Sequence, residues 1–298
     1  MKINIVFLGT GSSIPTAKRN HPGILLQYGA EQILIDCGEG IQRQFRIEGL
    51  NPCNITRILI THWHGDHVLG IPGLLQTLVH NNYNKKLFIY GPRGTKKYME
   101  VMMQMFIFHG RLDIKIEEVE GRFLDARDFY IDAAPMKHNI EANAYAFVEK
   151  DKLRIKKDVL KKKKISNSPE LKSLLLGKDA KIGSIILKAK ESTYLQKGKK
   201  IAIVLDTLMN ENVIKIAKDS SLLICESSFS KDEEDKAEEY FHLTAEQAAA
   251  IAEKANAEQL ILVHLSQRYD KSESKILAEA KKVFPKTRIA HDFMKLEI

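Results

Sequence analysis

The sequence lacks a long apolar run and is poor in cysteine. A membrane-spanning helix needs roughly 20 apolar residues, and no stretch of these 298 residues approaches that length. The N-terminal residues resemble a β-strand and lack the apolar core and small-residue cleavage site of a signal peptide. The three cysteines are far apart and include no Cys-x-x-Cys pair, which is typical of a reducing compartment. We therefore expect a cytoplasmic protein without a membrane segment.

Glycine motifs for nucleotides, internal repeats and low-complexity linkers are also absent. The glycines at 9–11 follow a predicted strand, but no Gly-x-Gly-x-x-Gly spacing exists, so we interpret them as a tight turn. Hydrophobic residues make up 44% of the chain, enough for a large core. We expect residues 1–298 to form a single α/β domain.

The most informative stretch is His-x-His-x-Asp-His at 62–67, directly after the apolar run 57–60. One histidine alone would be interpreted as a surface or core residue, but three histidines and an aspartate this close indicate a metal site. In an extended loop His62 and His64 project to the same side and can share one ion. Asp66 and His67 lie further round and can bind a second. Imidazole and carboxylate suit Zn²⁺, and Mn²⁺ would accept the same ligands.

Three further candidate metal ligands follow predicted strands. The alternation of strands and helices implies sheets covered by helices, and His138, Asp206 and His264 each come just after a strand. Asp36 also follows a strand, and we expect it to orient a ligand histidine. The expected ligands are His62, His64 and His138 for one ion, Asp66, His67 and His264 for the other, and Asp206 bridging them.

Two metals at such a site favour phosphodiester cleavage. A pair roughly 3.5–4 Å apart generates hydroxide and clamps the oxygens of an in-line displacement. The leaving oxygen still needs a proton, and Glu226, after the strand 221–225, could supply it together with His242. From the residues alone, Glu226 could equally be a structural acid and His242 a surface residue at a helix start.

Basic residues are concentrated in one segment. The net charge is +8, and residues 150–200 carry sixteen lysines and one arginine against five acids, a local +12. Residues 150–183 read as a helical excursion, after which strands at 184–189 and 200–205 return to the main fold. The Lys161–Lys164 run is either a solvated face or a surface for a phosphate backbone, and composition leaves both open.

Taken together, the motifs resemble the ribonuclease Z family, short form, of the metallo-β-lactamase superfamily. The His-x-His-x-Asp-His stretch is the superfamily's signature, and residues 7–12 (FLGTGS), 35–42 (IDCGEGIQ) and 69–75 (LGIPGLL) look like family motifs. The resemblance implies an αββα sandwich, two β-sheets flanked by helices, with a small protruding arm. It also implies two Zn²⁺ per subunit, a homodimer and precursor tRNA as the substrate.

The arm of that family is inserted where the basic segment 150–183 stands, between His138 and Asp206. The resemblance implies that it clamps the elbow of a tRNA, often one bound to the other subunit. Ser168-Pro169 replaces the family's Gly-Pro motif. The lysines expected to bind substrate are Lys161, Lys162, Lys163 and Lys164.

The resemblance also implies residue roles. Asp66 would help to hold and deprotonate a water, and Glu226 and His242 would protonate the departing 3′ oxygen. The 3′ trailer would leave with a 5′-phosphate, and the tRNA would keep a 3′-hydroxyl. Arg19 and Asn20 match the family's Pro-x-Lys-x-Arg-Asn loop and are expected to bind substrate, although its lysine is displaced by one position. The His-Glu-Ala-Thr motif appears as residues 225–228 (CESS).

Two alternatives differ in class. A small-molecule phosphodiesterase or thioesterase of the same fold would need neither the basic arm nor the Glu226–His242 pair. An RNA-binding module on an inactive hydrolase scaffold would have no reason to keep seven ligands. A β-CASP-type nuclease is disfavoured, because too few residues separate Asp206 from His264 for that family's inserted domain.

Overall fold

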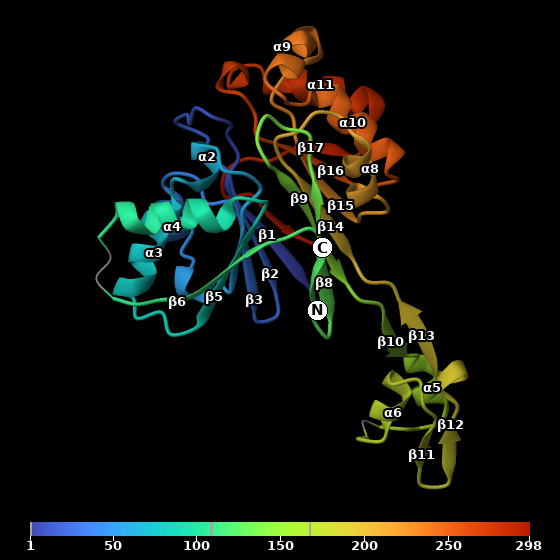
Figure 1. Ribbon diagram of the computed structural model, residues 1–298. Helices are drawn as coiled ribbons and strands as arrows, with labels where there is room; N and C mark the ends of the chain where they lie inside the picture. Colours follow the sequence, from blue (N-terminus) through green and yellow to red (C-terminus); the bar gives the residue numbers. More distant parts are fainter. Residues whose placement is uncertain (1, 108–109, 167) are drawn as a thin grey trace. The chain divides into compact units, whose positions relative to one another are not determined.

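The computed structural model describes residues 2–107, 110–166 and 168–298 (Figure 1). They form two compact units. The first consists of Met1–Asp125, Ile131–Phe147 and Lys200–Ile298, and the second of Ala126–Tyr130 and Val148–Lys199.

One seven-stranded sheet is built largely from the N-terminal half. Its β18, β1, β2 and β3 pair antiparallel, and β3 to β6 pair parallel. Most of β1 is buried, and it reads as a nearly continuous apolar run, as expected of a strand covered on both faces. In spatial order the strands are β18 (Lys295–Glu297), β1 (Ile3–Gly9), β2 (Gly23–Tyr28), β3 (Glu31–Ile35), β4 (Arg57–Leu59), β5 (Lys86–Gly91) and β6 (Asp113–Glu118).

The other seven-stranded sheet contains a parallel block. Its strands β14 to β17 pair parallel, and each crosses over through a helical connection. In spatial order the strands are β17 (Thr287–Ile289), β16 (Leu260–Val263), β15 (Leu222–Glu226), β14 (Lys200–Val204), β9 (Asn143–Glu149), β8 (Phe129–Pro135) and β7 (Gly121–Asp125).

Helices accompany both sheets. Figure 1 shows α2, α3 and α4 beside the first sheet and α8, α10 and α11 beside the second. In α3 the buried Ile71, Leu74, Leu75 and Leu78 recur at the spacing of one helix face. The predicted arrangement of helix-covered sheets is therefore confirmed. The helices of this unit are α1 (Ile41–Ile47), α2 (Gly65–Val68), α3 (Ile71–His80), α4 (Thr95–Met105), α8 (Glu211–Ala217), α9 (Glu234–Glu239), α10 (Ala245–Lys254) and α11 (Glu273–Val283), with 3-10 turns η1 (Pro52–Asn54), η2 (Lys231–Glu233) and η3 (Gln267–Tyr269).

The second unit has its own strands and apolar core. Its buried side chains include Leu171, Leu174 and Leu187. A strand expected at 184–189 was assigned wrongly to the main fold, because it pairs with β11 inside this unit. The unit reaches Lys199 and so extends beyond the expected segment 150–183. Its elements are β10 (Lys152–Ile155), α5 (Lys157–Lys162), α6 (Leu171–Leu175), β11 (Ala180–Ile182), β12 (Ile185–Leu187), α7 (Ala189–Ser192) and β13 (Thr193–Gln196).

Of the helices in the described parts of the chain, none is long and apolar enough to cross a membrane.

Candidate metal centre

The candidate site residues follow the carboxyl ends of neighbouring strands. In the second sheet, β14, β15 and β16 are parallel neighbours, so Asp206, Glu226 and His264 come together at one edge. In the first sheet the 62–67 loop follows β4. An isolated bridge joins His62 to Ala142 in the connection that carries His138. The topology thus gathers residues separated by up to about two hundred positions in the sequence.

One ligand group consists of His62, His64, His138 and Asp206. Nε2 of His62 lies 3.0 Å from Nδ1 of His64 and 3.4 Å from Oδ2 of Asp206. Nε2 of His138 lies 3.2 Å from the same His64 nitrogen. A Zn²⁺ at its usual 2.0–2.1 Å from each ligand places neighbouring ligand atoms roughly 3.4 Å apart. The spacing of these four atoms fits one such ion.

A second group consists of Asp66, His67 and His264. Nε2 of His67 lies 3.2 Å from Nε2 of His264 and 3.3 Å from Oδ2 of Asp66. Asp206 faces this group as well, since its Oδ1 is 3.3 Å from Nε2 of His264. The structure therefore brings all seven predicted ligands together, with Asp206 between the two groups.

The Nδ1 atoms of His62, His67 and His138 point away from the site, and each has a hydrogen-bond partner. Asp36 Oδ2 accepts from the Thr61 hydroxyl at 2.7 Å and from Nδ1 of His67 at 2.6 Å. Because the Thr61 proton goes to Asp36, the Thr61 oxygen accepts from Nδ1 of His62 at 3.1 Å. His138 donates from Nδ1 to the Phe241 carbonyl at 3.1 Å. In a neutral ring these bonds place the proton on Nδ1 and leave Nε2 free to face the site as a ligand.

Unprotonated nitrogens that face one another indicate a missing positive charge. If both rings are neutral, the 3.2 Å separation of the His67 and His264 Nε2 atoms sets two lone pairs against each other, so a proton or a cation has to lie between them. Oδ1 of Asp206 is buried and has no hydrogen-bond partner among the described residues. An orphaned buried carboxylate oxygen is costly unless a cation satisfies it. The residues present therefore fit a metal.

The electrostatics agree with this interpretation. Burial lowers the pKa of His62, His64 and His138, which favours the neutral imidazole that binds metal. Burial also opposes the charge on His67, but Asp206, Asp36 and Asp66 raise its pKa well above the usual value. The carboxylates around His67 thus attract positive charge, which either a proton or a cation supplies.

Three of the eight described non-glycine residues with left-handed backbone lie at the centre. Asp36, Phe241 and His264 adopt left-handed φ angles of 57°, 60° and 58°. Such a conformation costs a non-glycine residue on the order of 1 kcal/mol or more and persists only where the surroundings hold it. Here it directs the Asp36 carboxylate, the Phe241 carbonyl and the His264 ring toward the site.

Glu226 and His242 form a buried pair beside the ligands. Glu226 is fully buried, and Nδ1 of His242 lies 3.0 Å from its Oε2. Nε2 of His242 lies 4.0 Å from Oδ2 of Asp206, and the His242 side chain is 16% exposed. Burial lowers the pKa of His242, but Glu226 and Asp206 outweigh it and raise the pKa to about 9. His242 is placed to hold a proton next to the ligand groups.

The loop at 12–20 departs from the expected roles. Arg19 is 3% exposed; it donates from Nη1 to the Thr10 hydroxyl at 2.6 Å and to the Ala290 carbonyl at 2.7 Å, and it pairs with Glu273. Its burial does not fit the expectation of substrate contact, because these partners occupy the guanidinium. Asn20 donates to the Glu39 carbonyl at 2.8 Å. Lys18 is the exposed cation of the loop.

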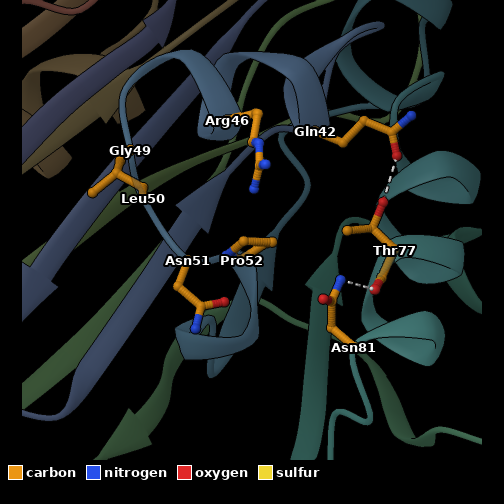
Figure 2. A pocket seen from close by; sticks show the side chains of 8 residues that line it. All are labelled: Gln42, Arg46, Gly49, Leu50, Asn51, Pro52, Thr77 and Asn81. Atoms are coloured by element: carbon orange, nitrogen blue, oxygen red, sulfur yellow. Dashed lines mark hydrogen bonds between the residues drawn. The ribbon is translucent and has the colours of Figure 1, made fainter.

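A separate pocket of about 560 Å³ lies on the first unit at the ends of α1 and α3 (Figure 2). In Figure 2, Thr77 joins the side chains of Gln42 and Asn81 through hydrogen bonds. Its described lining contains no acid, cysteine or histidine, so it does not offer the groups for hydrolysis. The lining residues are Gln42, Arg46, Gly49, Leu50, Asn51, Pro52, Thr77 and Asn81.

Known proteins resemble the chain over nearly its full length. Ribonuclease Z of Nanoarchaeum equitans is 40% identical over 268 residues, which is 90% of this chain and 85% of that protein. Ribonuclease Z of Methanothermobacter thermautotrophicus is 39% identical over 298 residues, 99% and 97% of the two chains. The chain belongs to the ribonuclease Z family. A family model described as anti-Pycsar protein Apyc1 also matches residues 3–105, a minority of the chain.

Solved structures agree on the fold. The crystal structure of human tRNase Z, short form, has a TM-score of 0.71 at 24% identity and covers 98% of both chains. The metallo-β-lactamase fold protein YhfI from Bacillus subtilis has a TM-score of 0.72 at 19% identity, over 100% of this chain and 99% of that one. The chain therefore has the metallo-β-lactamase fold predicted from its motifs. The fold and the two ligand groups together indicate a metal cofactor.

Sequence reasoning named Asp36 as a group that orients a ligand histidine but missed three others. Thr61, Ser228 and the Phe241 carbonyl each contact Nδ1 of a ligand histidine. Thr61 directly precedes His62, and a hydroxyl in that position was a usable signal. The Phe241 carbonyl had none, because a backbone atom carries no residue-specific pattern.

Proposed function

We propose that this chain is a two-zinc endoribonuclease that removes the 3′ trailer from precursor tRNA, leaving a tRNA 3′-hydroxyl and a trailer 5′-phosphate. The observation that carries the proposal is the pair of ligand groups joined by buried Asp206, with the Glu226–His242 pair beside them. Relatives named ribonuclease Z and the fold of human tRNase Z support the choice of RNA.

The proposed ligands are divided as the geometry groups them. His62, His64 and His138 would hold one ion, and Asp66, His67 and His264 the other, with Asp206 shared. Two zinc ions supply, when bound, an activated water and charge neutralisation at the phosphate, and manganese would suit the same donors. Asp36 would orient His67 directly and His62 through Thr61.

Three side chains would handle the proton transfers of the reaction. The Asp66 side chain is 11% exposed and lies next to His67 and His264. It would accept the proton of the attacking water. Glu226 accepts a hydrogen bond from Nδ1 of His242. The proton on Nε2 of His242 would then go to the departing 3′ oxygen. Positioned acid–base groups of this kind contribute typically 10²–10⁴-fold to a rate.

We propose that the second unit is the substrate-binding arm, inserted in a single metallo-β-lactamase-fold domain. Its own apolar core orders the unit without using its lysines. Lys161, Lys162, Lys163 and Lys164 are all exposed. Four ammonium groups on one short segment suit the phosphates of a structured RNA, which is recognised mostly by shape.

Two further expectations belong to this proposal. A homodimer would let the arm of one subunit hold a tRNA cut by the other, and light scattering on the purified protein would measure the mass. A cytoplasmic location agrees with the free thiols of Cys37, Cys53 and Cys225.

Comparing three substrates tests the proposal against its rival. The zinc-loaded protein would be given precursor tRNA, bis(p-nitrophenyl) phosphate and a thioester at matched concentrations. We expect kcat/KM for precursor tRNA to exceed the other two by at least a hundredfold. Equal or better turnover of the small phosphodiester or of the thioester would favour a small-molecule hydrolase.

A further inference from the structure

Glu226 is the centre of a hydrogen-bond network larger than its pair with His242. Its Oε1 accepts from the backbone N–H of Thr207, next to Asp206, at 2.8 Å. Its Oε2 accepts from the Ser228 hydroxyl, also at 2.8 Å. Ser228 in turn lies 2.9 Å from Nδ1 of His264. The buried Glu226 carboxylate is thus linked to the backbone beside Asp206, to His242 and, through Ser228, to His264.

The direction of the bonds at Ser228 follows from its single proton. Its Oγ lies near Glu226 Oε2 at 2.8 Å and the His264 carbonyl at 3.1 Å. The carboxylate is both nearer and charged, so the hydroxyl donates to Glu226. The Ser228 oxygen is then an acceptor, and Nδ1 of His264 donates to it. His264 therefore presents an unprotonated Nε2 to the second ligand group.

We propose that Ser228 is a positioning residue that couples the proton-donating pair to the metal centre. Through its hydroxyl, Glu226 fixes the orientation and tautomer of His264 while it also holds His242. The inference rests on the proposed function, since it assigns a role within that metal site.

The opposite side of the centre has the same construction. There Asp36 contacts His67 directly and reaches His62 through the Thr61 hydroxyl. Carboxylate-to-histidine contacts fix ring orientation and raise ligand basicity. The two sides differ in one respect, because Glu226 also serves His242. Changes at Ser228 should therefore affect metal retention through His264 even though Ser228 is not itself a ligand.

Ser227 offers a matched control for Ser228. Both side chains are buried, but the Ser227 hydroxyl bonds to the Val263 carbonyl at 3.3 Å, on the adjacent strand. Ser228→Ala and Ser227→Ala remove the same atom from neighbouring positions. Zn²⁺ retention would be measured by competition with a chromophoric chelator, and Co²⁺-loaded protein would report ligand geometry by its visible absorption.

We expect Ser228→Ala to weaken the affinity for one of the two Zn²⁺ ions at least tenfold and to alter the Co²⁺ spectrum. Ser227→Ala should stay within twofold of the wild type. Ser228→Thr, which keeps the hydroxyl, should restore retention, whereas Ser228→Val should not. Since threonine and valine have similar shape, this second pair separates loss of the hydroxyl from a folding defect.

A double-mutant cycle tests the route through the carboxylate. If Ser228 acts through Glu226, adding Ser228→Ala to Glu226→Gln should weaken Zn²⁺ retention by less than threefold more. Additive losses would overturn the coupling, and equal retention by Ser228→Ala and Ser227→Ala would overturn the positioning role. If the wild-type protein retained no metal, the proposed function would itself be wrong, and the inference would fall with it.

Discussion

The hydrogen bonds of each histidine at the centre indicate which ring nitrogen faces the site. Four present Nε2 to the site because Nδ1 is held by Asp36, Thr61, Ser228 or a carbonyl, whereas His64 presents Nδ1. His242 lies beside them and forms a further possible ligand group with Asp206 and His264; its Nδ1 is held by Glu226 and its Nε2 faces Asp206. We propose that His242 donates a proton to the leaving group.

Replacing His242 with alanine should therefore affect only substrates that need a proton at the leaving group. We expect His242→Ala to lower precursor tRNA cleavage at least a hundredfold. Hydrolysis of bis(p-nitrophenyl) phosphate should stay within threefold, because p-nitrophenolate leaves without protonation. Steady-state kinetics on both substrates measure the split, and a parallel loss on both would refute the role.

Arg19 and Lys18 should separate stability from binding. Arg19→Ala removes a buried cation from Glu273, Thr10 and the Ala290 carbonyl, so we expect it to lower the free energy of unfolding by about 2 kcal/mol or more. Lys18→Ala should leave unfolding unchanged and raise KM for precursor tRNA. Urea titration and kinetics of both variants decide the matter; unchanged stability of Arg19→Ala would contradict the structural role.

The predictability of these residues from sequence depended on their spacing. The 62–67 motif and the positions after strands sufficed for all seven ligand candidates. Ser228 was visible only as a departure from a motif, because its contact with His264 depends on β15 and β16 being neighbours. The burial of Arg19 depends on the C-terminal segment around Ala290, which nothing local in the sequence indicates.

At the scale of elements, we propose that the basic helix α5 contacts the RNA. Lys161 and Lys162 lie in its last turn, and Lys281 and Lys282 lie in the last turn of α11. We expect the double replacement Lys161→Ala and Lys162→Ala to weaken tRNA binding and to reduce the slope of log K against log salt by about 1.5.

The matching replacement of Lys281 and Lys282 on α11 is the control, and it should leave that slope nearly unchanged. Filter binding over a range of salt concentrations gives both slopes. Equal changes in slope for the two lysine pairs would show that α5 does not contact the tRNA more than α11 does. Loss of bis(p-nitrophenyl) phosphate hydrolysis in the α5 variant would indicate a structural role for the segment.

Strand pairing limited the prediction of elements. The apolar run at β12 was predicted as a strand, but its pairing with β11 was not. An apolar run indicates burial and does not indicate which strand lies beside it. Helices with a full apolar stripe, such as α3, were predictable from their spacing. The two-sheet architecture followed from the alternation and the family resemblance together.

Across the whole molecule, the buried negative charge should make stability depend on metal. Asp36, Asp66 and Asp206 lie together around His67, and a bound cation relieves their repulsion. At a free metal concentration a hundred times Kd, binding stabilises the folded state by about 2.7 kcal/mol. We expect chelator to lower the thermal midpoint by several degrees and added Zn²⁺ to restore it; an unchanged midpoint would contradict a tightly held metal.

Mapped cleavage of precursor tRNA tests the central claim most directly. Transcripts that carry a 3′ trailer and are labelled at either the 5′ or the 3′ end would be incubated with the protein, with and without chelator. We predict one chelator-sensitive cut just after the acceptor stem, with a 3′-hydroxyl on the tRNA and a 5′-phosphate on the trailer. No cut, or a cut that chelator does not abolish, would contradict it.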